Sequence, residues 1–270
     1  MELTNNNYYS LEANMEYMSC SQFKDFLKCE REALAKLIGA TEEEQSDALL
    51  FGGYIDAYFS GELDEYVVAH PEMINTRTNE LKAPFKNINE VISAIENDEV
   101  LLSYLQGKHQ VIMTGEIAGV KFKVKIDSLF EDKIVDQKVM KDMNLLWVER
   151  DGRNVKTDFV DAYGYDIQGA IYQEIVRQNI GKQLPFILAV ATKEESPDKA
   201  LIQIDQEYLD KALDLVKELA PHFDLVKQGL CVPTGCNHCP TCRKTHKVTG
   251  VVSYKELFNK KDTESEETNE

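Results

Sequence analysis

The sequence lacks any uninterrupted apolar run of the ~18 residues that a membrane-spanning helix needs. Its start also lacks the basic and apolar regions of a secretory signal. Glycine and proline are scarce, with 14 and 7 residues among 270, which excludes collagen-like and low-complexity chains. We therefore expect a globular, cytoplasmic protein.

Basic residues are few relative to acidic ones. The chain has 30 Lys and Arg against 47 Asp and Glu, which gives a formal net charge of -17 at pH 7. Phosphate binding depends on Lys and Arg that displace counterions, so this balance disfavours general attraction to nucleic acid. Any nucleic-acid site must therefore be a local basic groove.

Hydrophobic periodicity predicts a mixed α/β order. Apolar residues at helical spacing predict helices over residues 22–39, 41–61 and 88–105, the second with a capping box of Thr41 and Glu44. Alternating residues predict strands over 109–119, 120–130 and 133–139, followed by a helix over 158–181, strands over 185–194 and 200–206, and a helix over 206–227. Residues 1–20 are expected to be frayed, and 63–86 and 147–156 to be loop-rich. This order predicts a mixed central β-sheet flanked by helices.

Carboxylates and ammonium groups interrupt two of the predicted strands. Four polar side chains project to one side of the strand over 120–130: Lys121, Lys123, Lys125 and Asp127. On the next strand Asp136 and Lys138 share a face, and pairing of the two strands would bring Asp136 near Asp127. Two close carboxylates favour a hard divalent cation such as Mg²⁺, but a solvated ion pair on a half-exposed sheet is the competing interpretation.

A set of motifs in a fixed order favours the first interpretation. Asp127 is followed by Asp136-Gln137-Lys138 as a D-x-K element, and the next helix carries Gln168 and Tyr172 as Q-x-x-x-Y. The set resembles the PD-(D/E)XK nuclease superfamily and its RecB-like branch. Longer stretches, such as MSCSQFKDFLKCERE and CNHCPTCR, look like phage-encoded proteins similar to exodeoxyribonuclease VIII.

The resemblance implies a restriction-endonuclease-like fold and a metal-dependent DNA exonuclease. It would resect linear duplex ends in phage recombination together with a single-strand annealing protein, in the host cytosol. Asp127 and Asp136 would hold Mg²⁺ or Mn²⁺, and Lys138 would position the attacking water. Gln168 and Tyr172 would flank the site and touch the substrate phosphate.

Two further carboxylates are candidate metal ligands. Many RecB-like nucleases have a histidine in an early Gly-x-x-His segment, and Asp56 stands at that position here. Glu116, one strand before Asp127, is the other candidate, with a solvated strand carboxylate as the alternative.

The cysteines gather near the C-terminal end. Cys236, Cys239 and Cys242 form a C-x2-C-x2-C pattern that brings three thiolates together, and a fourth ligand would complete a metal site. The candidates for that ligand are Cys29, Cys231, His238 and His246. Iron–sulfur nucleases of the RecB-like branch draw one cysteine from an early helix and three from the C-terminal end. This resemblance implies a [4Fe–4S] cluster with Cys29, with Zn²⁺ and metal-free cysteines as the alternatives.

The remaining expectations concern organisation and binding. The nuclease domain is expected over residues 1–228, the cysteine segment packed on it over 229–250, and an acidic, disordered tail over 251–270. Two basic clusters are candidate DNA contacts, unless they are solvated faces: Lys121, Lys123 and Lys125, and Arg243, Lys244 and Lys247. A catalytically weak DNA-binding adaptor and a metal-stapled structural protein are the rival functions, and a homo-oligomer stays open.

Overall fold

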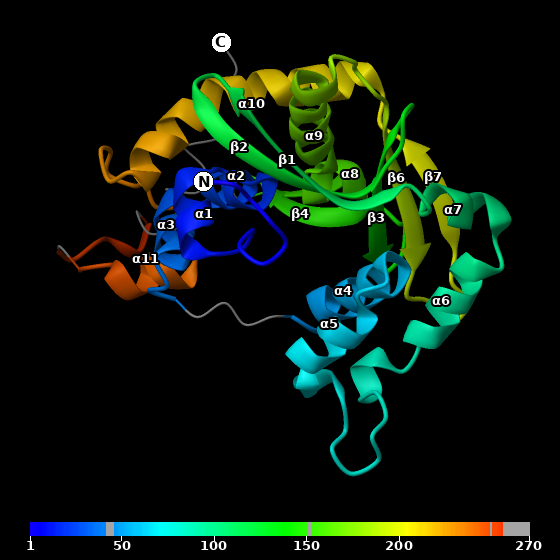
Figure 1. Cartoon of the computed structure of the whole chain (residues 1–270). Helices are drawn as coiled ribbons and strands as arrows, with labels where there is room; N and C mark the ends of the chain where they lie inside the picture. Colours follow the sequence, from blue (N-terminus) through cyan, green and yellow to red (C-terminus); the bar gives the residue numbers. More distant parts are fainter. Residues whose placement is uncertain (42–45, 151–152, 249, 256–270) are drawn as a thin grey trace.

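A five-stranded mixed sheet forms the centre of the computed structural model, which describes residues 1–41, 46–150, 153–248 and 250–255 (Figure 1). The strand order is β1 (Lys108–Ile117), β2 (Val120–Leu129), β3 (Ile134–Met140), β6 (Phe186–Thr192) and β7 (Lys199–Gln203). β3 and β6 are parallel, and the other neighbouring strands are antiparallel. The predicted α/β fold with a mixed central sheet is confirmed.

One face of the sheet is covered by α2 (Cys20–Lys28), α9 (Tyr165–Ile180) and α10 (Gln206–Lys227). β6 is buried along its whole length, as an apolar strand in the middle of a covered sheet should be. A Cβ at Gly169 of α9 would lie 2.6 Å from the Phe186 ring and 2.8 Å from a Leu209 methyl. The missing side chain at Gly169 therefore lets α9 lie directly on β6 and α10.

The other face carries a second apolar cluster. It is formed by α4 (Asp47–Ser60), α6 (Ile88–Glu96) and α7 (Glu99–Tyr104), with Phe51, Ile55 and Ile88 packed towards Val135 and Ile187. Between α4 and α6 the chain forms α5 (Leu63–Ala69), η1 (Pro71–Met73) and η2 (Ala83–Phe85). The segment over 63–86, expected to be loop-rich, therefore contains short helices.

Three predicted helices are each divided into two. The first ends at Cys29, whose backbone is extended, and α3 (Glu30–Leu37) follows. The helix predicted over 88–105 breaks before α7, where the Asp98 carboxylate accepts the Leu101 N–H at 3.0 Å. The helix predicted over 158–181 breaks at Gly164, which has a φ of 62° and separates α8 (Phe159–Tyr163) from α9. The apolar spacing continues across these short breaks, so periodicity alone did not predict them.

The N-terminal segment is ordered, and the expectation that it is frayed was wrong. It contains α1 (Leu11–Glu16), which begins at Ser10 with a hydrogen bond from the Ala13 N–H to the Ser10 hydroxyl. Tyr8 is buried. The segment therefore belongs to the folded body.

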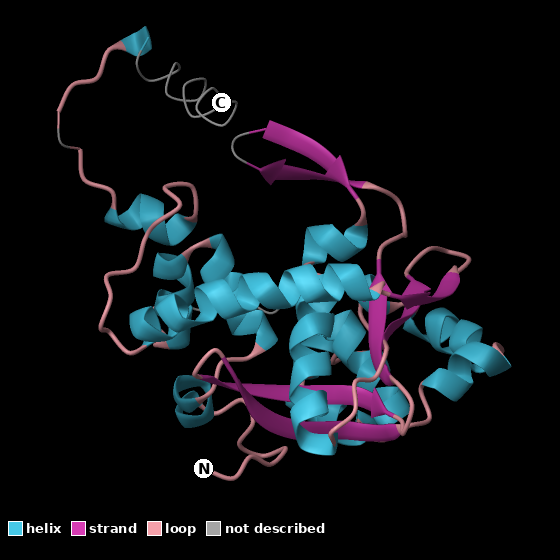
Figure 2. Cartoon of the chain, turned by 90° about the horizontal axis from the view of Figure 1, so that it is seen from above, coloured by secondary structure: helices cyan, strands magenta, loops and turns pink. Residues whose placement is uncertain are grey.

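The polar segment over residues 147–156 is also not a loop. It forms a hairpin of β4 (Leu146–Arg150) and β5 (Arg153–Thr157). Figure 2 shows this hairpin as two strands, joined by a short grey trace, that extend away from the body.

The ends of two predicted segments lie outside the described residues. The capping box of α4 includes Glu44, which is not described, whereas Ser46 accepts the Leu49 N–H at 3.3 Å at the start of the helix. The acidic tail from residue 256 onward is also not described. Earlier in the sequence, α11 (Pro240–Thr245) packs on α3. In the part of the chain that is described, no helix combines the length and apolar character needed to cross a membrane.

Candidate active site

The site begins where β2 and β3 separate. Their ladder pairs Leu129 with Ile134 and Ser128 with Val135. At the next position the Asp127 carboxylate accepts the Gln137 N–H at 2.9 Å. Asp127 therefore takes the place of a backbone partner and opens the space between the strands.

Asp127 lies in a crowded acidic environment. Burial raises the pKa of Asp127 well above its ordinary value of 3.8, and the nearby Asp136 and Asp56 carboxylates raise it further. A cation beside the ionised Asp127 carboxylate would offset this repulsion and is therefore favoured. The strand arrangement thus brings Asp127 and Asp136 together, as the predicted pairing required.

Asp136 is held from two sides. It is 1% exposed, and its Oδ1 accepts the Gln168 side-chain N–H at 2.6 Å. Its other carboxylate oxygen is in an ion pair with the Lys138 ammonium. Burial alone would lower the pKa of Lys138, but the Asp136 and Asp127 carboxylates outweigh it and raise that pKa above its usual range. Lys138 therefore stays charged inside the site.

The helix α9 supplies Gln168 and Tyr172, which lie one turn apart on the face towards the strands. Gln168 holds Asp136, and the Tyr172 hydroxyl donates to the Lys125 carbonyl at 3.1 Å. Both side chains line the pocket described below. In this structure their polar atoms position β2 and β3, and contact with a substrate phosphate stays a prediction.

Asp56 reaches the same site from α4. Its two carboxylate oxygens accept the Gln110 side-chain N–H at 3.2 and 3.0 Å. Burial raises the pKa of Asp56, although the Lys125 ammonium opposes the rise. Gln110 has a φ of 52°, an unusual value for a non-glycine residue in a strand, and it interrupts the pairing of β1 with β2 opposite Asp127.

These residues open into one pocket with a volume of about 690 Å³. Its walls come from the N-terminal segment, α2, α3, α4, β1, β2, β3 and α9. Five lysines and four aspartates line it: Lys24, Lys36, Lys123, Lys125, Lys138, Asp25, Asp56, Asp127 and Asp136. The acidic protein therefore contains a local concentration of ammonium groups around these carboxylates, as a nucleic-acid site would require.

The donor set of this pocket suits a hard divalent cation. Asp127, Asp136 and Asp56 offer carboxylate oxygens, which Mg²⁺ and Mn²⁺ prefer. The Lys138 ammonium contacts the carboxylate of Asp136. Burial raises the pKa values of Asp56 and Asp127, and repulsion from neighbouring carboxylates adds to the rise. A cation bound here would offset that repulsion.

Glu116 does not belong to this site, and its prediction as a ligand was wrong. It is exposed and pairs with Lys121 near the opposite end of the β1–β2 hairpin. The residue of β1 that faces Asp127 is Gln110, six positions away, which corresponds to about 20 Å of strand. A carboxylate at Glu116 is therefore too distant to share an ion with Asp127.

The three lysines of β2 have different environments. Lys121 pairs with Glu16 at 3.0 Å. Lys123 is 1% exposed, and its ammonium donates to the Tyr8 carbonyl and, at 2.7 Å, to Asn14 Oδ1. Its prediction as a DNA contact is wrong for this structure, because the ammonium is already used by the N-terminal segment. Lys125 lines the pocket.

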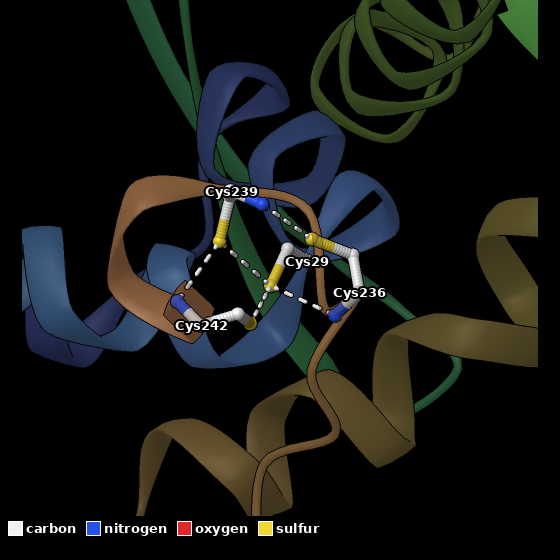
Figure 3. A group of neighbouring side chains, drawn as sticks. All are labelled: Cys29, Cys236, Cys239 and Cys242. Atoms are coloured by element: carbon white, nitrogen blue, oxygen red, sulfur yellow. Dashed lines mark hydrogen bonds between the residues drawn. The ribbon is translucent and has the colours of Figure 1, made fainter. Parts of the chain in front are cut away.

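A second cluster lies where α2 meets α3. The Cys29, Cys236, Cys239 and Cys242 Sγ atoms all lie within 4.8 Å of one another (Figure 3). The structure therefore brings together the four cysteines that the sequence grouped. Cys231 lies outside this set, as do His238 and His246. Arg243 and Lys244 are exposed on α11 beside the cluster.

Sequence reasoning missed several pocket residues. Gln110 gave no signal, because only the register of β1 places it beside Asp56. Tyr8 and Asn14 were missed because the N-terminal segment has no helical or strand periodicity. Lys24 and Lys36 lie on predicted helices, but nothing in the sequence shows that both face the pocket.

The chain belongs to the family described as a PDDEXK-like domain of unknown function (DUF3799), whose model matches residues 19–245. This finding confirms the predicted relation to the PD-(D/E)XK superfamily. The chain is also similar to the crystal structure of a "putative exonuclease" from Eubacterium rectale, at 45% sequence identity and a TM-score of 0.88. The similarity covers 96% of this chain and 98% of the other. No curated protein matches the chain.

Proposed function

We propose that the protein is a metal-dependent deoxyribonuclease that removes nucleotides from the ends of linear duplex DNA. The observation that supports this proposal most directly is the arrangement of Asp127, Asp136 and Lys138 in one lysine-lined pocket. The family membership and the similar protein from Eubacterium rectale support the nuclease class.

The cation would be held by Asp127 and Asp136, with Asp56 as a third donor. When bound, Mg²⁺ or Mn²⁺ polarises a phosphoryl oxygen and lowers the pKa of a coordinated water. The carboxylates keep their orientation through hydrogen bonds from Gln168 and the Gln137 N–H. Fixed ligands of this kind need little reorganisation during the reaction.

Lys138 is placed to act on the charge that develops at the phosphate. Its ammonium is half-buried beside Asp136, and the surrounding carboxylates keep it protonated. A charged ammonium in this position orients the attacking water and stabilises the pentacoordinate phosphorane-like charge. Lys24, Lys36 and Lys125 line the same pocket and would hold neighbouring phosphates.

Tyr9 is the side chain best placed to receive a terminal base. It lines the pocket, is 72% exposed and lies edge-on to Tyr8 with ring centroids 4.9 Å apart. An exposed aromatic ring beside a phosphate site provides a stacking surface worth about 1–3 kcal/mol per base. Tyr9→Ala should therefore raise KM for duplex ends about tenfold with little change in kcat, whereas Tyr9→Phe should retain the wild-type KM.

The role in phage recombination follows from the same proposal. An enzyme that resects duplex ends produces the single strands that an annealing protein pairs, so such a protein is the proposed partner.

The test is digestion of an end-labelled linear duplex with and without Mg²⁺. Release of labelled nucleotides only with the metal supports the proposal, and a covalently closed circle of the same sequence should resist. Binding of DNA without cleavage under all metal conditions would instead support the adaptor function. Cleavage of linear and circular substrates at equal rates would contradict the requirement for an end.

A further inference from the structure

The four clustered sulfur atoms are close together. The Cys29 Sγ lies 3.7 Å from the Cys239 Sγ and 3.6 Å from the Cys242 Sγ, and all four Sγ atoms, including that of Cys236, fall within 4.8 Å. Figure 3 shows the four side chains pointing towards one another from the α2–α3 junction and the C-terminal segment. All four are free cysteines, so no disulfide accounts for the approach.

This spacing discriminates between the two metal centres that the sequence left open. A single tetrahedral ion with metal–sulfur bonds of about 2.3 Å places its sulfur ligands about 3.8 Å apart. In a [4Fe–4S] cluster each thiolate binds a different iron at its own corner of a cube, which separates the ligand sulfurs by roughly 6 Å. The observed set fits one ion and does not fit the cluster.

We propose that Cys29, Cys236, Cys239 and Cys242 hold a single Zn²⁺ ion in a closed, four-thiolate structural site. Four thiolates are a ligand set that zinc uses in structural sites. This proposal replaces the iron–sulfur cluster that the family resemblance implied, and it does not depend on the proposed nuclease activity.

Backbone N–H groups surround the sulfur atoms. The Cys236 Sγ accepts hydrogen bonds from the N–H groups of His238 and Cys239 at 3.4 and 3.2 Å. The Cys239 Sγ accepts from the Cys242 N–H at 3.3 Å, and the Cys29 Sγ accepts from the Cys236 N–H at 3.5 Å. Such donors disperse the negative charge of thiolates and orient them towards a metal.

Contacts that involve no cysteine side chain hold the two chain segments together. The buried Glu30 carboxylate accepts the Thr234 N–H at 2.8 Å and lies 2.9 Å from the His222 Nε2. The Arg31 N–H donates to the Thr234 carbonyl at 3.0 Å. A Cβ at Gly235 would lie 2.9 Å from the Cys242 Sγ, so only glycine leaves room for the sulfur there. The fold therefore preorganises the site.

The ion would determine the angle between α2 and α3. Cys29 is the residue that joins the two helices, and residues of both line the active-site pocket, including Lys24 and Lys36. A metal bond at the junction would fix the positions of these two lysines relative to β2 and β3. We therefore assign the zinc a structural role in forming one wall of the pocket.

The experiment is metal analysis of the full chain, purified without oxygen from cells supplied with both iron and zinc. We expect about one zinc per chain, negligible iron and a colourless protein. Cys29→Ser should lose the zinc, whereas Cys231→Ser, which changes a cysteine outside the four, should keep it. About four irons per chain in a brown protein would overturn the proposal, as would a metal-free wild-type protein or zinc that persists in Cys29→Ser.

A measurement on the wild-type protein covers the case in which Cys29→Ser does not fold. X-ray absorption at the zinc edge should show sulfur neighbours alone, at about 2.3 Å. Nitrogen or oxygen neighbours in the first coordination sphere would instead indicate a site that uses His238 or His246, and would overturn the four-cysteine assignment.

Discussion

The ionised Asp127 carboxylate lowers the stability of the folded protein, and its proposed role as a metal ligand would explain why it is there. This half-buried carboxylate lies beside two others, and its pKa in the folded protein is raised above 3.8. In the unfolded chain the group ionises near 3.8, so the folded state loses stability as the pH rises above that value towards the raised pKa. Below 3.8 both states are protonated, and the cost disappears.

Asp127→Asn should therefore stabilise the protein in the presence of EDTA. The amide oxygen can still accept the Gln137 N–H, while the charge repulsion is removed. We expect a higher Tm than wild type at pH 8, with a difference that shrinks as the pH falls towards 5. Thermal unfolding across this range is the measurement.

Asp132→Asn is the matched control, because Lys133 lowers the pKa of the exposed Asp132. That substitution should give no gain in Tm at pH 8. An Asp127→Asn protein that is less stable than wild type throughout would contradict the cost assigned to Asp127.

Asp136→Ala should abolish metal-dependent cleavage while the protein remains folded, because the carboxylate is a proposed ligand. Glu116→Gln is the control, since Glu116 lies at the far end of the β1–β2 hairpin. Its rate should equal that of wild type. Circular dichroism would verify the fold, and substantial Mg²⁺-dependent cleavage by Asp136→Ala would remove that residue from the site.

Lys138→Ala should bind DNA and metal but cleave about 10²–10³-fold more slowly, as expected for the loss of one electrostatic stabiliser. Single-turnover kinetics with saturating enzyme separates this effect from binding. A wild-type rate would assign the role to another ammonium of the pocket, with Lys125 as the first candidate.

At the scale of elements, the sequence predicted those whose character is set locally. Periodicity and apolar content predicted the two long helices α9 and α10, the meander β1–β2–β3 and the buried strand β6. The hairpin β4–β5 was missed, although Asp151-Gly152 is a common hairpin turn sequence. The break at Cys29 gave no local signal, since the backbone there is extended and the partner of its Sγ, the Cys236 N–H, lies more than 200 positions away.

The docking of α9 depends on Gly169, which gives a prediction for the whole helix. Gly169→Ala would place a Cβ 2.6 Å from Phe186, and this overpacking should cost about 1–3 kcal/mol of stability. Gln168 would shift with the helix and lose its fit to Asp136, so kcat should fall as well. Denaturant unfolding and cleavage rates measure the two effects.

Gly52→Ala of α4 is the control, because nothing lies within 4 Å of a Cβ at that position. There the substitution should leave stability unchanged or raise it by about 0.5–1 kcal/mol. Equal losses of stability at Gly52 and Gly169 would mean that close helix packing is not the reason for the glycine in α9.

At the scale of the whole molecule, an acidic protein is proposed to bind DNA through one lysine-lined pocket. Its affinity should then fall with salt through the few phosphates that the pocket lysines contact. Lys125→Gln should reduce the slope of log K against log[salt] by about 1, without loss of stability. Fluorescence anisotropy with a labelled duplex at several salt concentrations is the measurement.

Lys123→Met should behave differently. Its ammonium is buried against Tyr8 and Asn14, so the substitution leaves their oxygens without a donor and should cost about 2–3 kcal/mol of stability. The salt slope of the folded protein should stay unchanged. A reduced slope in Lys123→Met, with unaltered stability, would restore this residue as a phosphate contact.

The α2–α3 junction at Cys29 and the residues that contact it are synthesised at different times. Thr234 and Cys236, which contact Glu30 and Cys29, are translated more than 200 residues after them. At a synthesis rate of about 5–20 residues per second, the ribosome makes the α2–α3 junction roughly 10–40 seconds before its partners. The β-sheet and its acidic residues are complete before that junction is secured. The nascent chain therefore acquires its finished pocket only after Thr234 and Cys236 have been made.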